Sequence, residues 1–230
     1  MSSQALIPPR SVLDSAPPVL PAKVLRSDAQ ALQAAREVAA VAREHAARRD
    51  QQRELPWAEI ELFTRSGLGS ISVPKAYGGP EVSFETVAEV FRLISAADPA
   101  LGQIPQNQFG MLQLLRLTAT PAQQAVLFRS VLDGWRIGNA GPERGTKDTL
   151  TLKARINRAG DGYRISGEKF YSTGALFAHW VAVKALDEEG RQRLAFVRRG
   201  TPGLRIVDDW SGFGQRTTAA QAVEDAAKPI

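Results

Sequence analysis

The chain has 230 residues, no cysteine, two histidines and a formal net charge of +5, and 43% of its residues are apolar. This composition is typical of a globular protein with one or two domains. The absence of cysteine excludes disulfides, thiolate metal sites and cysteine nucleophiles. With only two histidines, we also expect no metal site. The chain shows no apolar run long enough to cross a membrane, no signal peptide and no dense basic block, so we expect a cytoplasmic protein that binds neither a membrane nor a nucleic acid.

The first 26 residues contain five prolines among small and polar residues. Proline cannot propagate a helix or pair within a central strand, so this segment is expected to be a flexible arm. Ser27 has the side chain of an N-cap, and an alanine-rich helix is predicted from there to about Arg53. Its small apolar residues favour close helix packing. Its arginines are expected to face solvent, namely Arg43, Arg48, Arg49 and Arg53.

Further helical segments complete an all-helical N-terminal domain over residues 27–134. Ser83 has an N-cap side chain, and the pairs Asp98-Pro99 and Thr120-Pro121 place proline in a first helical turn. The predicted segments run from Trp57 to Ser66, from Ser83 to Ala97, from Asp98 to about Leu117 with an interruption at Pro105, and from Thr120 to near Gly134.

After Gly134 the apolar period changes from helical to alternating. One predicted strand face carries Leu150, Leu152, Ala154 and Ile156, and further strand-like runs cover residues 163–165, 180–186, 193–198 and 204–207. Turn residues separate these runs. The pattern predicts an antiparallel, β-barrel-like middle domain over residues 135–219, and therefore an α+β fold with two domains.

Three stretches resemble conserved motifs of one flavoprotein family. They are residues 73–79 (VPKAYGG), 96–100 (AADPA) and, most specifically, 162–175 (GYRISGEKFYSTGA). In this order they are similar to the N-terminal and middle domains of the acyl-CoA dehydrogenase superfamily, and the resemblance covers about residues 29–218. The dinucleotide fingerprint, the phosphate loop and the nucleophile elbow are missing.

The resemblance implies a flavin site at two segments. Tyr171 takes the place of the family's tryptophan along the flavin, Thr173 that of its threonine near flavin N5, and Ser172 replaces an apolar residue between them. The family's second flavin strand falls on residues 140–143, where its threonine is missing, so Asn139 is expected to supply the polar contact beside Ala140 and Gly141. Candidates for the substrate side are Gln106 and Asn107, although a polar helix face explains them equally well.

Other stretches resemble one branch of this superfamily. Residues 138–140 (GNA), 208–210 (DDW) and 212–218 (GFGQRTT) are similar to the flavin-dependent monooxygenases of dibenzothiophene desulfurisation and sulfur acquisition. Members of that branch take reduced FMN from a separate flavin reductase and oxygenate a small organosulfur compound. FMN is therefore the expected cofactor, with FAD as the alternative. A second hypothesis is an FAD-dependent acyl-CoA dehydrogenase that oxidises the α,β bond of an acyl-CoA thioester. A third is a non-catalytic remnant or interaction module.

The resemblance ends near Ala219. The family continues into a C-terminal helical bundle that supplies the catalytic base and builds the homo-oligomer, whereas residues 220–230 match nothing in it. We therefore expect a truncated chain with an incomplete middle domain and a non-family tail. Its catalytic residues stay unassigned, and its activity and homo-oligomerisation are open. His179 has no acidic residue at a readable spacing, so we expect it to be a buried hydrogen-bonding residue rather than a general base.

Overall fold

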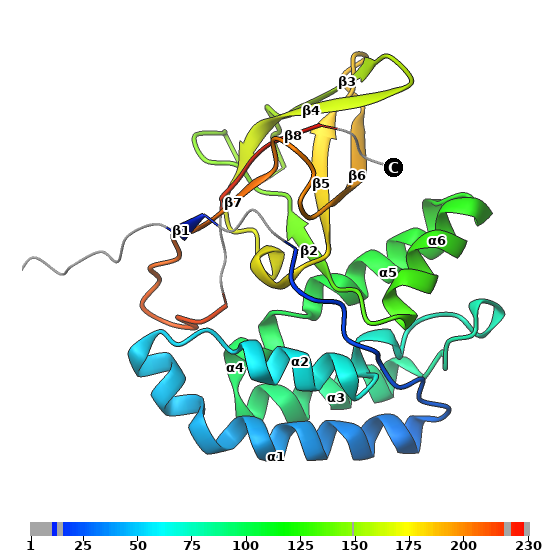
Figure 1. The fold of residues 1–230 in the computed structure, drawn as a ribbon, viewed down its shortest axis with the longest axis vertical. Helices are drawn as coiled ribbons and strands as arrows, with labels where there is room; N and C mark the ends of the chain where they lie inside the picture. The colour runs from blue at the N-terminus through cyan, green and yellow to red at the C-terminus, as the bar shows by residue number, and fades with distance from the viewer. Residues whose placement is uncertain (1–10, 13–15, 149, 219–221, 228–230) are drawn as a thin grey trace, which may run out of the picture.

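The computed structural model describes residues 11–12, 16–148, 150–218 and 222–227. Its helices form one layer and its strands another, with the helices at the bottom of the view in Figure 1. The helices are α1 (Asp28–Gln52), α2 (Trp57–Arg65), α3 (Phe84–Ala97), α4 (Pro99–Gln103), α5 (Gln106–Thr118) and α6 (Pro121–Leu132). None of these helices is long and apolar enough to span a membrane.

The predicted caps begin these helices. The Ser27 hydroxyl accepts a hydrogen bond from the backbone N–H of Gln30, and Thr120 forms a capping box with Gln123. The Asp98 carboxylate accepts from the first backbone N–H groups of α4. Pro105 separates α4 from α5, as predicted. The local sequence therefore determines where most of the helices start.

The solvent-facing assignment of α1 is wrong at two arginines. Arg49 is only 2% exposed, and its guanidinium lies 2.6 Å from a Glu59 oxygen and 2.7 Å from an Asp98 oxygen. Arg53, the C-cap of α1, pairs with Asp208 of the β region. Both contacts arise because the last turn of α1 passes over buried carboxylates contributed by distant segments. These charges would be costly to bury without a partner.

The strands form one sheet that is mixed rather than antiparallel. They are β1 (Ser11–Val12), β2 (Ile137–Ala140), β3 (Arg155–Ala159), β4 (Gly162–Lys169), β5 (Trp180–Leu186), β6 (Gln192–Arg198), β7 (Arg205–Asp208) and β8 (Ala222–Ala227). The order is β1-β7-β8-β4-β3-β5-β2, with β6 on β5. The antiparallel prediction fails because β5 runs parallel to both β2 and β3. A purely alternating pattern could not reveal that direction.

Two details of the predicted β domain also change. Leu150 is 84% exposed and β3 begins only at Arg155, whereas Leu152, Ala154 and Ile156 are buried, so the expected apolar face fails only at Leu150. The segment expected to be a non-family tail contributes β8, whose backbone pairs with β4 and β7.

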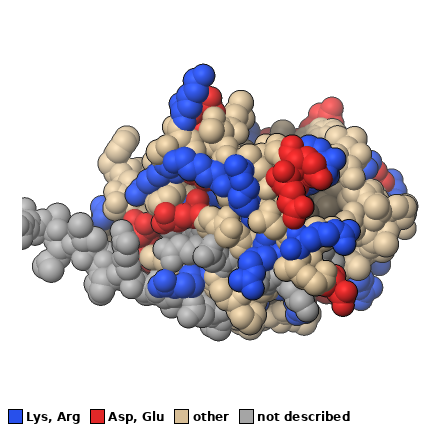
Figure 2. Space-filling view, turned by 90° about the horizontal axis from the view of Figure 1, so that it is seen from above, with Lys and Arg blue, Asp and Glu red and all other residues tan. Residues whose placement is uncertain are grey.

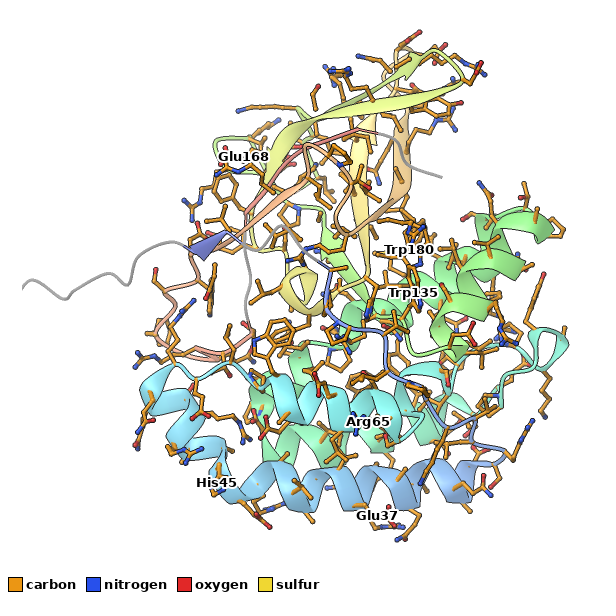
Figure 3. The ribbon with its side chains drawn as sticks, in the orientation of Figure 1. Glu37, His45, Arg65, Trp135, Glu168 and Trp180 are labelled. Atoms are coloured by element: carbon orange, nitrogen blue, oxygen red, sulfur yellow. The ribbon has the colours of Figure 1, made fainter. Side chains whose placement is uncertain are left out.

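The two faces of β5 pack on different apolar clusters. Val181 and Val183 join the cluster that includes α1, α2 and α3, whereas Trp180 and Ala182 join the cluster built on α5 and α6. Because side chains alternate across a strand, every second residue of β5 and of its neighbours looks toward α5 and α6. Between the helices and the sheet, Trp135 and Trp180 lie side by side, with ring centroids 5.5 Å apart (Figure 3).

The proline-rich arm is docked over its described residues 16–26, contrary to expectation. The Lys23 N–H donates to the Arg65 carbonyl at 3.1 Å, and Leu25 is buried. Figure 1 shows this dark-blue segment passing from the sheet to the start of α1. An extended proline-rich chain leaves its carbonyls unpaired, so neighbouring donors can hold it. One of these donors is His179, whose Nε2 lies 3.2 Å from the Pro18 carbonyl oxygen.

His179 is a buried structural residue, as predicted. Its Nδ1 accepts the Arg136 backbone N–H at 2.9 Å, so the neutral ring with its proton on Nε2 satisfies both partners. Burial and the nearby Arg136 charge lower the pKa of His179 to about 4. The other histidine, His45, lies on the outer side of α1, away from the sheet (Figure 3).

Stability is expected to fall as the pH drops from about 6.5 to about 4. In this range the unfolded chain protonates His179, with an ordinary pKa of 6.5, whereas the folded chain does not. The loss amounts to about 3 kcal/mol, since each pKa unit corresponds to roughly 1.4 kcal/mol. Urea unfolding at a series of pH values measures it. His45→Gln should keep this dependence and His179→Gln should flatten it; an unchanged slope in His179→Gln would contradict the assignment.

Basic and acidic side chains are interspersed on the sheet end of the molecule (Figure 2). Asp187, directly after β5, accepts hydrogen bonds from the side chains of Arg191 and Arg193. These hydrogen bonds, together with one from the Arg191 backbone N–H, hold the pKa of Asp187 well below its usual range even though burial opposes the shift. The arginine-rich composition therefore includes paired charges on this face.

Candidate functional site

The six predicted cofactor residues lie on two segments that run side by side. The Asn139 N–H donates to the Thr173 carbonyl at 3.2 Å, and the Phe170 N–H donates to the Pro142 carbonyl at 2.9 Å. The end of β2 is thereby joined to the loop that follows β4. We call residues 139–141 and 170–174 the candidate site.

Tyr171 and Ser172 point in opposite directions. Tyr171 is 52% exposed, has φ +54° and meets the edge of Trp210 with ring centroids 6.3 Å apart. A left-handed conformation is uncommon for an aromatic residue, and such outliers often mark functional sites. Ser172 is fully buried, and its hydroxyl has no hydrogen-bond partner in the described part of the chain. A ligand on this surface would therefore meet the backbone of Ser172 rather than its hydroxyl.

Thr173 and Asn139 are both half-buried, and Ala140 is fully buried in the core. Asn139 lies on the face of β2 that looks toward α5, because Ile137 on the same face packs in the α5–α6 cluster, and Gly141 directly follows this strand. A Cβ on Gly141 would lie 3.4 Å from Asn139 Oδ1 and 3.6 Å from Lys184 Cδ. The missing side chain of Gly141 thus leaves a space bordered by an amide and a lysine.

A buried ion pair anchors the loop that follows β2. Lys169 Nζ lies 2.5 Å from Glu143 Oε1 and donates to the Gly141 carbonyl at 3.2 Å, and the two side chains are 1% and 4% exposed. Glu143 also accepts from the backbone N–H groups of Lys153 and Ala154. Burial lowers the pKa of Lys169. Burial alone would raise the pKa of Glu143, but the hydrogen bonds from Lys169 and the two amides lower it. The pair fixes Gly141 next to Phe170, at the base of the candidate site.

Gly138 lets β2 approach the short helix η3 (Ala175–Phe177) that follows the candidate site. A Cβ on Gly138 would lie 2.6 Å from Ala175 Cα and 2.7 Å from its backbone nitrogen. Gly138→Ala should therefore lower the free energy of unfolding by about 1–3 kcal/mol through overpacking. Gly110→Ala in α5 is the control, since nothing lies within 4 Å of its Cβ position, and it should stabilise the chain by up to about 1 kcal/mol. Urea unfolding compares the two, and equal effects would refute the close approach.

The substrate-side candidates stand at the first turn of α5. Gln106 is exposed and Asn107 is half-buried, and in the described residues no hydrogen bond joins either side chain to the candidate site. The segment before α5 nevertheless reaches that site, because a Cβ on Gly174 would lie 2.8 Å from the Ile104 carbonyl oxygen. The start of α5 is therefore a neighbour of residues 170–174.

Three side chains shape this region through contacts between segments that are distant in sequence. Gln108 joins the helical half to β2, since its amide nitrogen donates to Gly69 and its oxygen accepts from the Ile137 N–H at 2.9 Å. Glu143 and Lys184 are the other two. In the sequence, such a side chain is marked only as a polar residue within an apolar run. Its partners cannot be identified from this pattern, because they lie far away in the sequence.

The enclosed cavity between the helical half and β2 is not a cofactor site. Its lining includes Thr64, Gln108 and Phe177, and its volume is only about 20 Å³. A space of this size holds about one water molecule.

Comparison with known proteins covers both halves of the chain. The family model for the acyl-CoA dehydrogenase N-terminal domain matches residues 27–134. A probable FMNH2-dependent monooxygenase SfnC from Pseudomonas putida is 30% identical, over 82% of this chain and 47% of its own length. A dibenzothiophene monooxygenase from Rhodococcus erythropolis is 31% identical, over 80% of this chain and 46% of its own. The chain thus spans about half the length of these relatives.

A solved structure gives the same result in three dimensions. FMN-bound TdsC from Paenibacillus sp. A11-2 superposes with a TM-score of 0.79 at 28% identity, over 87% of this chain and 54% of that one. The α+β architecture, with a helical region followed by a mixed sheet, is therefore shared with a protein that binds FMN.

Proposed function

The chain belongs to the acyl-CoA dehydrogenase superfamily, and we propose that it forms the flavin-binding part of a reduced-FMN-dependent monooxygenase acting on small organosulfur compounds. It is related to such monooxygenases at about 30% identity. The observation that carries the proposal is the hydrogen-bonded pairing of residues 139–142 with residues 170–173, beside an outward-facing Tyr171.

The residues of the candidate site fit a flavin. Tyr171 offers an exposed ring for the isoalloxazine, while Thr173 and Asn139 offer a hydroxyl and an amide for its polar atoms. Ala140, Gly141 and Ser172 would contribute through their backbone. FMN, when bound, supplies the redox chemistry that activates oxygen. The chain's own residues hold and orient the ring, and the Lys169–Glu143 pair keeps the two segments together.

Gln106 and Asn107 remain proposed contacts on the substrate side, because they begin a helix whose preceding residue Ile104 touches the candidate site. A flavin reductase would supply reduced FMN. The second candidate function is an FAD-dependent acyl-CoA dehydrogenase, which the match of residues 27–134 to that family's N-terminal domain favours.

Titration of the full chain with FMN and with FAD tests the proposal. We expect FMN to bind, and Tyr171→Ala to weaken binding about tenfold by removing an aromatic contact. Tyr163→Ala, at another exposed tyrosine on β4, should bind FMN normally, and so should Ser172→Ala. Preference for FAD would favour the dehydrogenase, and lack of any flavin binding would favour a non-catalytic role.

Turnover separates the two enzyme hypotheses. The flavin-loaded chain is reduced under air, once with a reductase and dibenzothiophene or its sulfone, and once with an acyl-CoA. Oxygenated sulfur product supports the monooxygenase. Formation of an enoyl thioester instead would contradict it.

A further inference from the structure

Lys184 borders the candidate site on a neighbouring strand. It follows Val183, which lies opposite Ala140 in the parallel pairing of β5 with β2. Its Cδ is 3.6 Å from the position that a Cβ on Gly141 would occupy, and Asn139 Oδ1 is 3.4 Å from the same position. The lysine stem therefore occupies the edge of the space that the missing side chain of Gly141 leaves open.

The strand alternation places Lys184 on the same sheet face as Asn139. Trp180 and Ala182, four and two residues before Lys184, pack in the α5–α6 cluster, as does Ile137, two residues before Asn139. Toward the ends of β2 and β5 this face changes from apolar to polar. A lysine and an amide thus follow the apolar part of the face where the candidate site begins.

The two lysines in this region, Lys169 and Lys184, differ in whether a carboxylate pairs with them. Lys169 is fully buried and paired with Glu143. Lys184 is only half-buried, and no described carboxylate lies within ion-pair distance of it. The Lys184 charge is close enough to contribute to lowering the pKa of Lys169, after the larger effect of burial. Lys184 is therefore a cation that no described carboxylate balances, as is Arg144, whose guanidinium lies 4.1 Å from the centroid of the Phe170 ring. Such cations would attract a ligand that carries negative charge.

We infer that Lys184 is a cofactor-contact residue whose ammonium group stabilises negative charge on the pyrimidine edge of the bound flavin. This inference rests on the proposed function. Reduction adds negative charge to that part of the ring at neutral pH, so an adjacent cation favours reduced FMN over oxidised FMN.

The experiment compares full-length wild type, Lys184→Met and Lys184→Arg. The affinity for oxidised FMN is measured by quenching of flavin fluorescence, and the midpoint potential of bound FMN by reductive titration. For Lys184→Met we expect oxidised FMN to bind within about threefold of wild type and reduced FMN to bind about tenfold more weakly. A tenfold difference corresponds to about 30 mV for a two-electron couple. Lys184→Arg keeps the positive charge, so the midpoint potential of its bound FMN should lie close to that of wild type.

Lys75→Met is the matched control, since Lys75 is an exposed lysine on η2 (Lys75–Tyr77) of the helical half. It removes the same charge as Lys184→Met and should leave the midpoint potential of bound FMN unchanged. The comparison therefore distinguishes a local effect of Lys184 from the effect of the protein's net charge. An unchanged potential in Lys184→Met, with normal FMN binding, overturns the role of Lys184 and leaves the proposed function intact. Failure of the wild type to bind FMN overturns both.

Discussion

Replacement of Arg49 by alanine is expected to lower the free energy of unfolding by about 3–5 kcal/mol. The guanidinium is 3% exposed and contacts carboxylates of Glu59 and Asp98 that are themselves largely buried. Without Arg49 these carboxylates keep the cost of leaving water but lose their counter-charge. The effect should extend to α4, because Asp98 also caps that helix. Urea or thermal unfolding followed by circular dichroism measures the change.

The neighbouring arginine provides the control. Arg48 pairs with Glu54 at 3.3 Å, but both side chains are about half exposed, at 52% and 49%. Exposed pairs contribute roughly 0–1 kcal/mol, so Arg48→Ala should be almost neutral. Similar losses in the two variants would show that burial of the Arg49 network does not contribute as described.

Replacement of Lys169 by methionine is expected to cost about 3–5 kcal/mol and to abolish tight FMN binding. The variant leaves Glu143 buried without its cation and removes the hydrogen bond to the Gly141 carbonyl. The loop after β2 then loses its side-chain link to β4 and is held to the rest of the candidate site by backbone hydrogen bonds such as that from the Phe170 N–H to the Pro142 carbonyl. Chemical unfolding measures the stability, and FMN titration measures the site.

The double variant Lys169→Met/Glu143→Gln distinguishes charge from packing. Glutamine keeps an oxygen for the backbone N–H groups of Lys153 and Ala154 but carries no charge. It should therefore recover much of the stability lost in Lys169→Met. Lys153→Met is a control, because the Lys153 ammonium donates only to the Gly145 carbonyl in an exposed loop. A double variant as unstable as Lys169→Met would contradict the electrostatic explanation.

Local signals predicted the helical half well. Ser27, Ser83, Asp98 and Thr120 each begin a helix, because a cap needs only the side chain and the next few backbone N–H groups. The sequence could not show that Arg49 is buried. Its partners Glu59 and Asp98 are brought to α1 by tertiary packing, and an arginine on a helix normally faces water.

The sequence predicted the two segments of the candidate site, but it did not predict how they pair to form one surface. The stretch of residues 162–175 pointed to Tyr171 and Thr173, whereas the pairing of Asn139 with Thr173 depends on parallel strand order. The resemblance could not show that the Ser172 side chain is buried beside the exposed Tyr171. Lys184 carries no local signal, since its place beside Gly141 follows from strand register.

The most direct test of the account is amide hydrogen exchange of the full chain with and without FMN. This experiment asks whether the end of β2 and the loop after β4 together form the flavin surface. FMN is expected to slow exchange in residues 139–143 and 170–174 and to leave the outer turns of α1 unchanged. FMN-dependent protection confined to other segments, or no protection at saturating FMN, would contradict it.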